Sequence, residues 1–113
     1  MARVTALMVF IVALVPIGAS AKDTRFWNLT AHTITSLQLS PAGRNAWGSN
    51  QADNDRDHTV DHDERLKITG IGPGQYDVKF ASADGRVCIV RNVEIKANAV
   101  FSISENELTN CTR

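Results

Sequence analysis

Apolar and polar residues alternate with a period of two through most of this sequence, and this alternation constrains the fold more than any other feature. In Gln75–Ala81 every second residue is apolar, so we expect Asp77 and Lys79 between them to face solvent. The same period marks the segments 25–29, 33–39, 65–69, 86–90, 92–96 and 100–104. No segment after residue 21 shows the period of an amphipathic helix. The chain is therefore predicted to be all-β.

Turn-forming residues separate these segments. Residues 40–43 and 70–74 are rich in Gly and Pro, and Asp84-Gly85 is a typical hairpin turn. The apolar positions change parity near Ser36, which indicates a β-bulge. Short strands joined by tight turns are typical of sandwiches, so we predict a single antiparallel β-sandwich of about seven strands.

The N-terminal residues have the pattern of a cleavable export signal. Arg3 precedes a mostly apolar run, 5–17, which is too short to span a membrane, and small residues at 19–21 suit signal peptidase. We therefore expect a signal peptide at residues 1–21 and one domain at residues 22–113. The mature domain is expected to be periplasmic or secreted, with no membrane attachment after cleavage.

Cys88 and Cys111 are the two cysteines of the chain. In an oxidising compartment, a cysteine pair in a small domain is typical of a disulfide. We expect a Cys88–Cys111 bond that ties the patternless C-terminal tail to a strand. The alternative is two unpaired thiols, and cysteines this far apart lack the spacing of a zinc site.

The segment Leu66–Ile103 contains an apolar strand, the sequence GIGPGQYDV, a hairpin and two further alternating stretches. It resembles the C-terminal part of prealbumin-like and carboxypeptidase-regulatory-like sandwiches. The front half, with FWNLTAHTITSLQLSPAG and NAWG, is similar to small exported bacterial proteins of unknown role. These resemblances imply export and an immunoglobulin-like or prealbumin-like β-sandwich, and they imply no reaction.

The acidic stretch Asp53–Glu64 is the strongest candidate for a functional site. It contains half of the 12 Asp and Glu residues of the chain. Calcium binds about six to eight oxygen atoms, and the spacing here resembles an EF-hand loop, with acids at the first, third, fifth, ninth and twelfth places. The expected calcium ligands are Asp53, Asp55, Asp57, the backbone carbonyl of Thr59, Asp61 and Glu64.

Two features of this stretch depart from the EF-hand pattern. The sixth place, which is Gly in EF-hands because the backbone there turns sharply, is His58. The flanking segments are predicted to be coil and strand instead of helices. The alternative interpretation of Asp53–Glu64 is a solvated acidic loop or a surface for a partner.

Other candidate sites have weaker patterns. His58 and His62 are four residues apart, a spacing that aligns metal ligands only on a helix. No nucleophile elbow accompanies His32, and the acidic loop is expected to be hydrated, so we predict no catalytic residues. Trp27 is expected in the core, and Trp47 either pins the long loop or offers a platform to a ligand.

These patterns leave three hypotheses about function. Basic residues outside the acidic loop are dispersed, so nucleic acid is not expected as a partner. The first hypothesis is an exported, non-enzymatic structural or protein-interaction module with an unknown protein or cell-envelope partner. The second is a calcium-binding exported protein that uses the Asp53–Glu64 loop. The third is a small enzyme or enzyme inhibitor.

Overall fold

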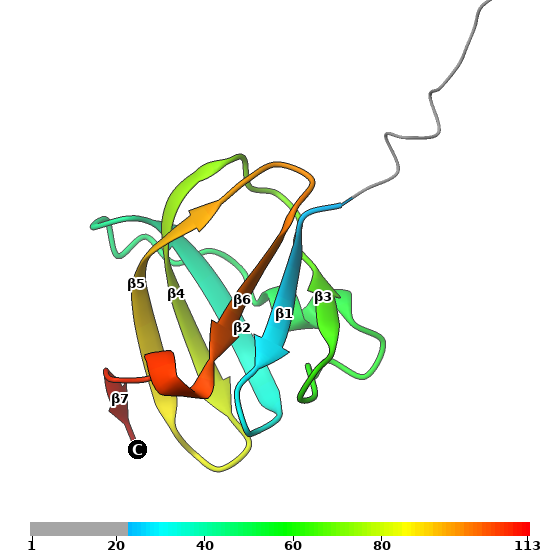
Figure 1. Ribbon diagram of the computed structural model, residues 1–113, viewed down its shortest axis with the longest axis vertical. Coiled ribbons are helices and arrows are strands. Elements are labelled where there is room, and N and C mark those ends of the chain that lie inside the picture. The colour runs from blue at the N-terminus through cyan, green and yellow to red at the C-terminus, as the bar shows by residue number, and fades with distance from the viewer. Residues whose placement is uncertain (1–22) are drawn as a thin grey trace, which may run out of the picture.

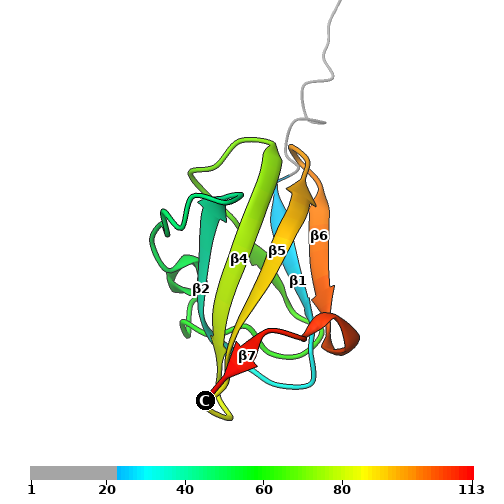
Figure 2. The same ribbon diagram turned by 90° about the vertical axis from the view of Figure 1, so that its left-hand side faces the viewer.

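The computed structural model describes residues 23–113, which form two β-sheets packed face to face (Figure 1). The expected signal peptide lies outside the described residues. Figure 2 shows β4 and β5 of one sheet beside β1 and β6 of the other. The strands are β1 (Arg25–Leu29), β2 (Ile34–Pro41), β3 (Arg65–Lys67), β4 (Gly74–Ser82), β5 (Val87–Ile95), β6 (Val100–Ser104) and β7 (Cys111–Thr112). The predicted all-β sandwich is confirmed.

The two sheets differ in width. The wider sheet has the order β2-β4-β5-β7, and the narrower one has the order β3-β1-β6. Neighbouring strands are antiparallel except for β1 and β6, which run parallel with Phe26 beside Phe101. The alternation of residues does not predict this parallel pair, because an inward and outward pattern is the same for both strand directions.

Inward-facing apolar side chains from both sheets form one core. Phe26 and Phe101 lie in the narrower sheet with their ring centroids 5.5 Å apart. Burial of each such side chain contributes roughly 1.5–3 kcal/mol to folding. The largest fully buried apolar side chains are Phe26, Phe80, Ile34, Leu37, Ile95, Ile103, Val60 and Val78.

Asp77 in β4 lies opposite a bulge in β5. Asp77 was predicted to face solvent, but it is only 1% exposed, so this prediction is wrong. The register with β5 shifts between Tyr76 and Val78, and Asn92 on β5 has a φ of 57°. Two residues of β5, Arg91 and Asn92, thus stand opposite Asp77. Hydrogen bonds from these two residues and from the turn after β2 cover its carboxylate, while the alternation of β4 is unchanged.

Two other expectations about the strands have different outcomes. Segments 86–90 and 92–96 were predicted to be separate strands, but they form one strand, β5, which continues through the bulge. The bulge predicted near Ser36 is confirmed, since the register of β2 with β4 shifts between Ile34 and Ser36.

The C-terminal tail is attached to β5 as the presence of two cysteines predicts. A disulfide joins Cys88 to Cys111, and these two residues are also cross-strand neighbours of β5 and β7. Before β7, the short 3-10 turn η3 (Glu105–Glu107) starts at a capping box, in which Ser104 N–H donates to Glu107 Oε1. The disulfide and the cap together fix the tail against the wider sheet.

Residues 23–113 contain no helix that is long and apolar enough to cross a membrane.

Candidate functional site

The acidic loop Asp53–Glu64 is anchored to the sandwich near its middle. Val60 is fully buried, and its N–H donates to Ile34 O at 2.8 Å while its C=O accepts from Ile34 N–H at 2.9 Å. The loop begins in the 3-10 turn η2 (Gln51–Asn54), where Ala52 is buried. Packing on both sides therefore fixes the path of this loop.

The first half of the loop hydrogen-bonds mainly within itself. Asp53 Oδ1 lies 3.1 Å from His58 Nδ1. Asp57 Oδ1 accepts a hydrogen bond from the Thr59 hydroxyl at 3.0 Å. Hydrogen bonding between the carboxyl groups of Asp55 and Asp57 raises the pKa of Asp55 and lowers the pKa of Asp57. These contacts close the loop without a ligand.

The second half of the loop hydrogen-bonds toward its own end and to neighbouring strands. Asp61 Oδ1 accepts from the Thr33 hydroxyl at 3.0 Å. Glu64 Oε1 accepts from the backbone N–H of Asp61 at 2.8 Å. Asp63 Oδ1 accepts from the indole N–H of Trp27 at 2.9 Å. The loop carboxylates are thus distributed among separate partners.

The expected calcium ligands are not gathered around one point. Within residues 23–113, no three His, Cys, Asp or Glu side chains are placed to hold a metal ion together. One feature of an EF-hand loop is present, since His58, at the sixth place, has a φ of 62°. Calcium binding would require Asp53 and Asp57 to leave His58 and Thr59, and it stays a prediction.

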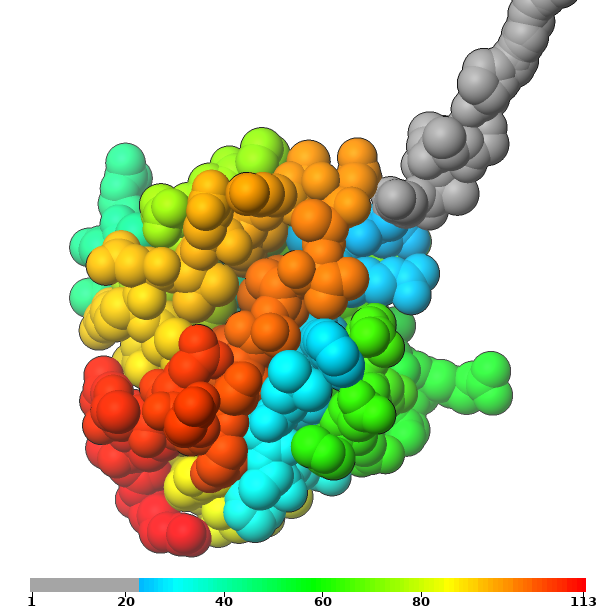
Figure 3. Space-filling model, viewed as in Figure 1, coloured from blue at the N-terminus to red at the C-terminus, as the bar shows by residue number. Residues whose placement is uncertain are grey.

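The outer face of the narrower sheet carries exposed basic and apolar side chains, and Figure 3 shows this side of the molecule. Trp27 was predicted to lie in the core, but it faces outward and is half-buried, because Phe26 and Asn28 take the inward positions of β1. We call this surface the Trp27 face. It consists of Arg25, Trp27, Arg65, Lys67, Val100 and Ser102, whose strand neighbours face the core.

Trp27 is held in place at the centre of the Trp27 face. The guanidinium carbon of Arg65 lies 4.0 Å from the centroid of the Trp27 ring, a cation–π contact. The indole N–H is fixed by Asp63. Beside it, Val100 is 49% exposed, and Arg25 pairs at 3.8 Å with the exposed Asp23. The face thus combines an ordered aromatic ring with cations and an exposed aliphatic side chain.

Trp47 lies on the other side of the sandwich and holds the long loop to it. Its ring lies 4.7 Å from Lys79 Nζ on β4. The next residue, Gly48, donates its N–H to Leu39 O at 2.9 Å, and Gln38 Nε2 donates to Gly48 O. These contacts support the loop-pinning interpretation of Trp47.

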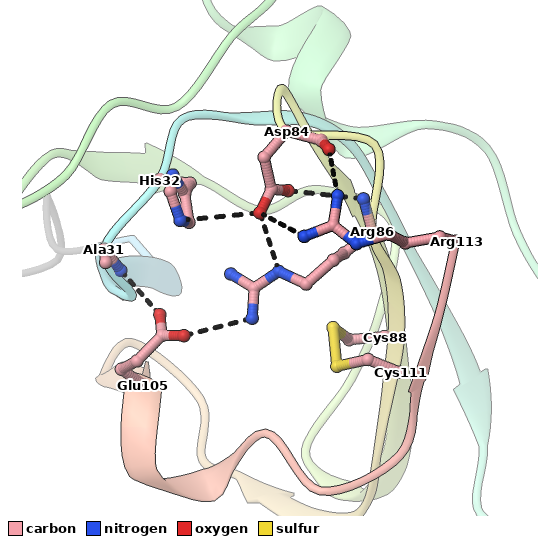
Figure 4. Close-up of a disulfide and its surroundings, with 8 residues drawn as sticks. All are labelled: Ala31, His32, Asp84, Arg86, Cys88, Glu105, Cys111 and Arg113. Atoms are coloured by element: carbon pink, nitrogen blue, oxygen red, sulfur yellow. Dashed lines mark hydrogen bonds and ion pairs between the residues drawn. A yellow bond between two sulfur atoms is a disulfide. The ribbon is translucent and has the colours of Figure 1, made fainter.

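A group of charged side chains closes the end of the sandwich near the disulfide (Figure 4), and we call it the end cluster. Arg86 donates to Asp84 Oδ2 at 2.9 Å and to Glu105 Oε2 at 3.0 Å. Glu105 Oε1 also accepts the backbone N–H of Ala31. The end cluster consists of His32, Asp84, Arg86, Glu105 and Arg113. It ties the β1–β2 loop, the β4–β5 hairpin, η3 and the C-terminus together.

The electrostatics of the end cluster keep its carboxylates charged. Hydrogen bonds from Ala31 N–H and Arg86 hold the pKa of Glu105 below its usual value. Burial alone would raise the pKa of Asp84, but the N–H and charge of Arg86 and the charge of His32 outweigh it, so this pKa is also lowered. Carboxyl groups of lowered pKa are poor general acids at neutral pH.

The end cluster does not form a Ser-His-Asp arrangement. His32 Nε2 lies 3.4 Å from Asp84 Oδ2, but the nearby Ser82 hydroxyl makes no hydrogen bond within residues 23–113. A serine nucleophile requires a hydrogen bond to its general base. The contacts of the end cluster join loops and turns, and the buried Nη2 of Arg86 has no hydrogen-bond partner among the residues that the structure describes.

Neither the Trp27 face nor the end cluster was predicted from the sequence. The alternation in Arg65–Lys67, with Leu66 between two bases, could have indicated two outward cations. The end cluster joins residues that are far apart in the chain, and its only local signal is the Asp84-Gly85 hairpin turn.

Comparisons with known proteins identify no relative of this chain. No protein-family model matches it, and no curated protein and no solved structure is significantly similar to it. The resemblance of Leu66–Ile103 to prealbumin-like domains therefore stays a prediction about the family, although the sandwich itself is present.

Proposed function

We propose that this chain is an exported, non-enzymatic interaction module that binds a protein partner through the Trp27 face. One observation carries the proposal: Trp27 and Arg65 form an ordered, half-exposed pair among outward cations on the outer face of the narrower sheet. Trp and Arg are the residues most enriched where interfaces gain their binding energy. The matching partner surface is acidic with an apolar centre.

Two further observations support this proposal. The disulfide between Cys88 and Cys111 fits an oxidising compartment outside the cytoplasm, as the expected signal peptide does. The charged side chains with the most buried contacts, such as Asp77 and Arg86, hold loops and turns in place.

A capture experiment tests the proposed surface. The immobilised mature protein is incubated with envelope and secreted proteins of its source, and the same is done with Arg65→Glu and Arg44→Glu. Both variants reverse one exposed charge, but Arg44 lies in the loop after β2, outside the Trp27 face. We expect a protein that is retained by the wild type and by Arg44→Glu and lost with Arg65→Glu. No retained protein, or equal loss in both variants, contradicts the proposal.

The second candidate function is calcium binding at the Asp53–Glu64 loop, and the φ of 62° at His58 favours it. A site without preformed ligands should bind weakly, at about 0.1 to 1 mM. The test is the melting temperature with several millimolar calcium and with chelator, for the wild type and for Asp53→Ala/Glu64→Gln. A calcium-dependent rise that the double variant lacks supports binding, and the absence of a rise removes this candidate.

A further inference from the structure

The outer edge of β6 has unpaired backbone groups. Arg25 N–H donates to Ala99 O at 3.0 Å, so the odd-numbered residues of β6 direct their N–H and C=O groups toward β1. Ser104 N–H points to the opposite side, where it donates to Glu107 Oε1. By the same alternation, Val100 and Ser102 direct their N–H and C=O groups away from β1. No strand within residues 23–113 pairs with this edge.

The two edges beside the long loop are covered. At the edge of β3, the Lys67 carbonyl accepts a hydrogen bond from Asn54 Nδ2 at 2.9 Å. At the edge of β2, the Leu39 carbonyl accepts from Gly48 N–H and the Leu37 N–H donates to Asn50 Oδ1, both at 2.9 Å. Residues of the long loop thus take the place of a neighbouring strand at both edges.

The remaining edge of the wider sheet is protected by other means. β7 contains only Cys111 and Thr112. Beyond β7, the free part of β5 carries the bulge at Asn92 and the exposed charges of Arg91 and Glu94. Short strands, bulges and charges are the devices by which proteins prevent pairing at an edge.

β6 has none of these devices. Its sequence, VFSIS, contains no charge and no proline, and its register with β1 is continuous from Val100 to Ser104. Val100 is 49% exposed. An uncharged, straight edge strand is a template for the addition of another strand.

An added strand would also cover apolar surface on β5. Val90 lies in the same inward row as Leu39 and Val78, which are buried, but Val90 itself is only half-buried. Val93, in the next inward row, is half-buried as well. The narrower sheet ends at β6, one strand short of the width of the wider sheet, so the inward face of β5 is incompletely covered.

We propose that the outer edge of β6 accepts one extended strand from a partner protein, with apolar residues inward and acidic residues outward. This inference rests on the proposed function, since the strand belongs to the partner that the Trp27 face binds. Val100 and Ser102 supply two N–H and two C=O groups to the new ladder. The inward side chains of the strand pack on Val90 and Val93. Its outward acids lie beside Val100 and Ser102 of β6, and Arg25 follows Val100 on the next strand, β1.

Charge favours this occupant over a second copy of the chain. β6 pairing with β6 of a second copy would set two Trp27 faces side by side, each with Arg25, Arg65 and Lys67. In that arrangement the two Arg25 side chains lie three strand spacings, about 14 Å, apart, and they repel each other. An outward acid on a partner strand lies two spacings, about 10 Å, from Arg25, so its attraction is screened less than the repulsion between copies.

Amide hydrogen exchange tests the proposal directly. In the free protein we expect slow exchange at Phe101 and Ile103, whose amides face β1, and fast exchange at Val100 and Ser102. The probe is a peptide of about seven alternating glutamate and valine residues, long enough for one short strand. Its addition should slow exchange at Val100 and Ser102 by about tenfold or more.

Two controls separate strand addition from other binding. The first is the same peptide with N-methylated backbone amides, which cannot donate to β6 and should leave exchange unchanged. The second is a matched pair of variants, Ser102→Pro and Ser102→Thr. Proline removes only an N–H that faces away from β1, so the ladder should survive, as slow exchange at Phe101 and Ile103 would verify. Peptide protection should be lost in Ser102→Pro and kept in Ser102→Thr.

The possible results distinguish this inference from the proposed function. Equal protection by the methylated and unmethylated peptides, or no protection by either, overturns strand addition without involving any variant. Protection of Val100 and Ser102 that grows with the protein's own concentration overturns the partner strand in favour of a second copy. If Arg65→Glu abolishes partner capture and Ser102→Pro leaves it unchanged, the Trp27 face stands as the binding surface and strand addition fails.

Discussion

Replacement of Asp77 by alanine should destabilise the domain more than replacement of any other charged residue within residues 23–113, because Asp77 is the most buried of them. Asp77 is 1% exposed in β4. One carboxylate oxygen accepts from Gly43 N–H and from Arg91 Nη1, both at 2.9 Å, and the other accepts from Asn92 N–H at 3.1 Å. The residue therefore joins the turn after β2 to the bulge of β5.

The size of the effect follows from what Asp77→Ala leaves behind. Removal of one partner of a buried ion pair costs about 3–5 kcal/mol when the other charge stays buried. The Arg91 side chain is 46% exposed and can be hydrated again, so we expect the low end, about 3 kcal/mol. For a domain of this size, 1 kcal/mol changes the melting temperature by roughly 4–8 °C, so the variant should melt roughly 12–24 °C lower.

Urea denaturation followed by tryptophan fluorescence measures this free energy of unfolding. The matched control is Arg91→Gln, which removes the same ion pair but keeps the buried carboxylate bonded to Gly43 and Asn92. Its cost should stay near 1 kcal/mol, the value of a partly exposed charged contact. A loss below about 1 kcal/mol in Asp77→Ala, or equal losses in both variants, would refute the argument that the buried carboxylate carries the effect.

The pH dependence gives an independent check. Burial alone would raise the pKa of Asp77, but hydrogen bonds from Gly43, Asn92 and Arg91 outweigh it and hold this pKa below its usual value. A lowered folded-state pKa contributes stability that is present above the unfolded pKa, about 3.9, and is lost as the pH falls through the folded value. The stability difference between the wild type and Asp77→Ala should therefore shrink below about pH 4. A difference that stays constant down to the acid transition would contradict this assignment.

Three further changes test other parts of the structure. Cys88→Ser/Cys111→Ser opens a loop with a sequence separation of 23 and should cost about 3 kcal/mol in urea denaturation; an equal stability of oxidised and reduced wild type would contradict this. His58→Val should be about 1–2 kcal/mol less stable than His58→Gly, because φ is 62° there and a β-branched residue avoids that region; equal melting temperatures would show that the loop relaxes. Asp63→Ala should cost about 1 kcal/mol and shift tryptophan emission, since the Trp27 indole loses its side-chain acceptor at 2.9 Å and keeps only the longer contact, 3.3 Å, to the Asp63 carbonyl; Asp63→Asn keeps a side-chain acceptor and should change neither.

The sequence was sufficient for the fold class and for the disulfide, because both depend on local signals. Alternation and turns mark the strands, and a chain with two cysteines has only one internal pairing available. The prediction of solvent exposure failed at Asp77 because groups from residues 43, 91 and 92, which lie on other segments, cover its carboxylate. Alternation identifies the inward residues Tyr76, Val78 and Phe80 of β4, but it does not show which distant segments cover the outer face of the strand.

The acidic loop illustrates a different limit. The spacing of Asp53–Glu64 and the positive φ at its sixth place agree with an EF-hand loop. The hydrogen-bond partners of the carboxylates depend instead on the tertiary fold, which places Thr33 beside Asp61 and Trp27 beside Asp63. Spacing alone therefore predicts which oxygens are available, and the fold determines which of them already have partners.

The β6 edge shows why a binding surface on a sandwich is harder to predict than its core. Phe101 and Ile103 alternate with Val100 and Ser102 in the same way in an edge strand as in a central one, so the pattern identifies the inward face only. Whether the backbone of Val100 is free depends on which strand pairs with β6, and that neighbour, β1, lies far away in the sequence and pairs in parallel. The covered edges of β2 and β3 depend likewise on the path of one long loop. The proposed binding edge of β6 therefore depends on which backbone N–H and C=O groups the strand order leaves unpaired. Hydrogen exchange at individual amides measures directly whether an N–H is unpaired.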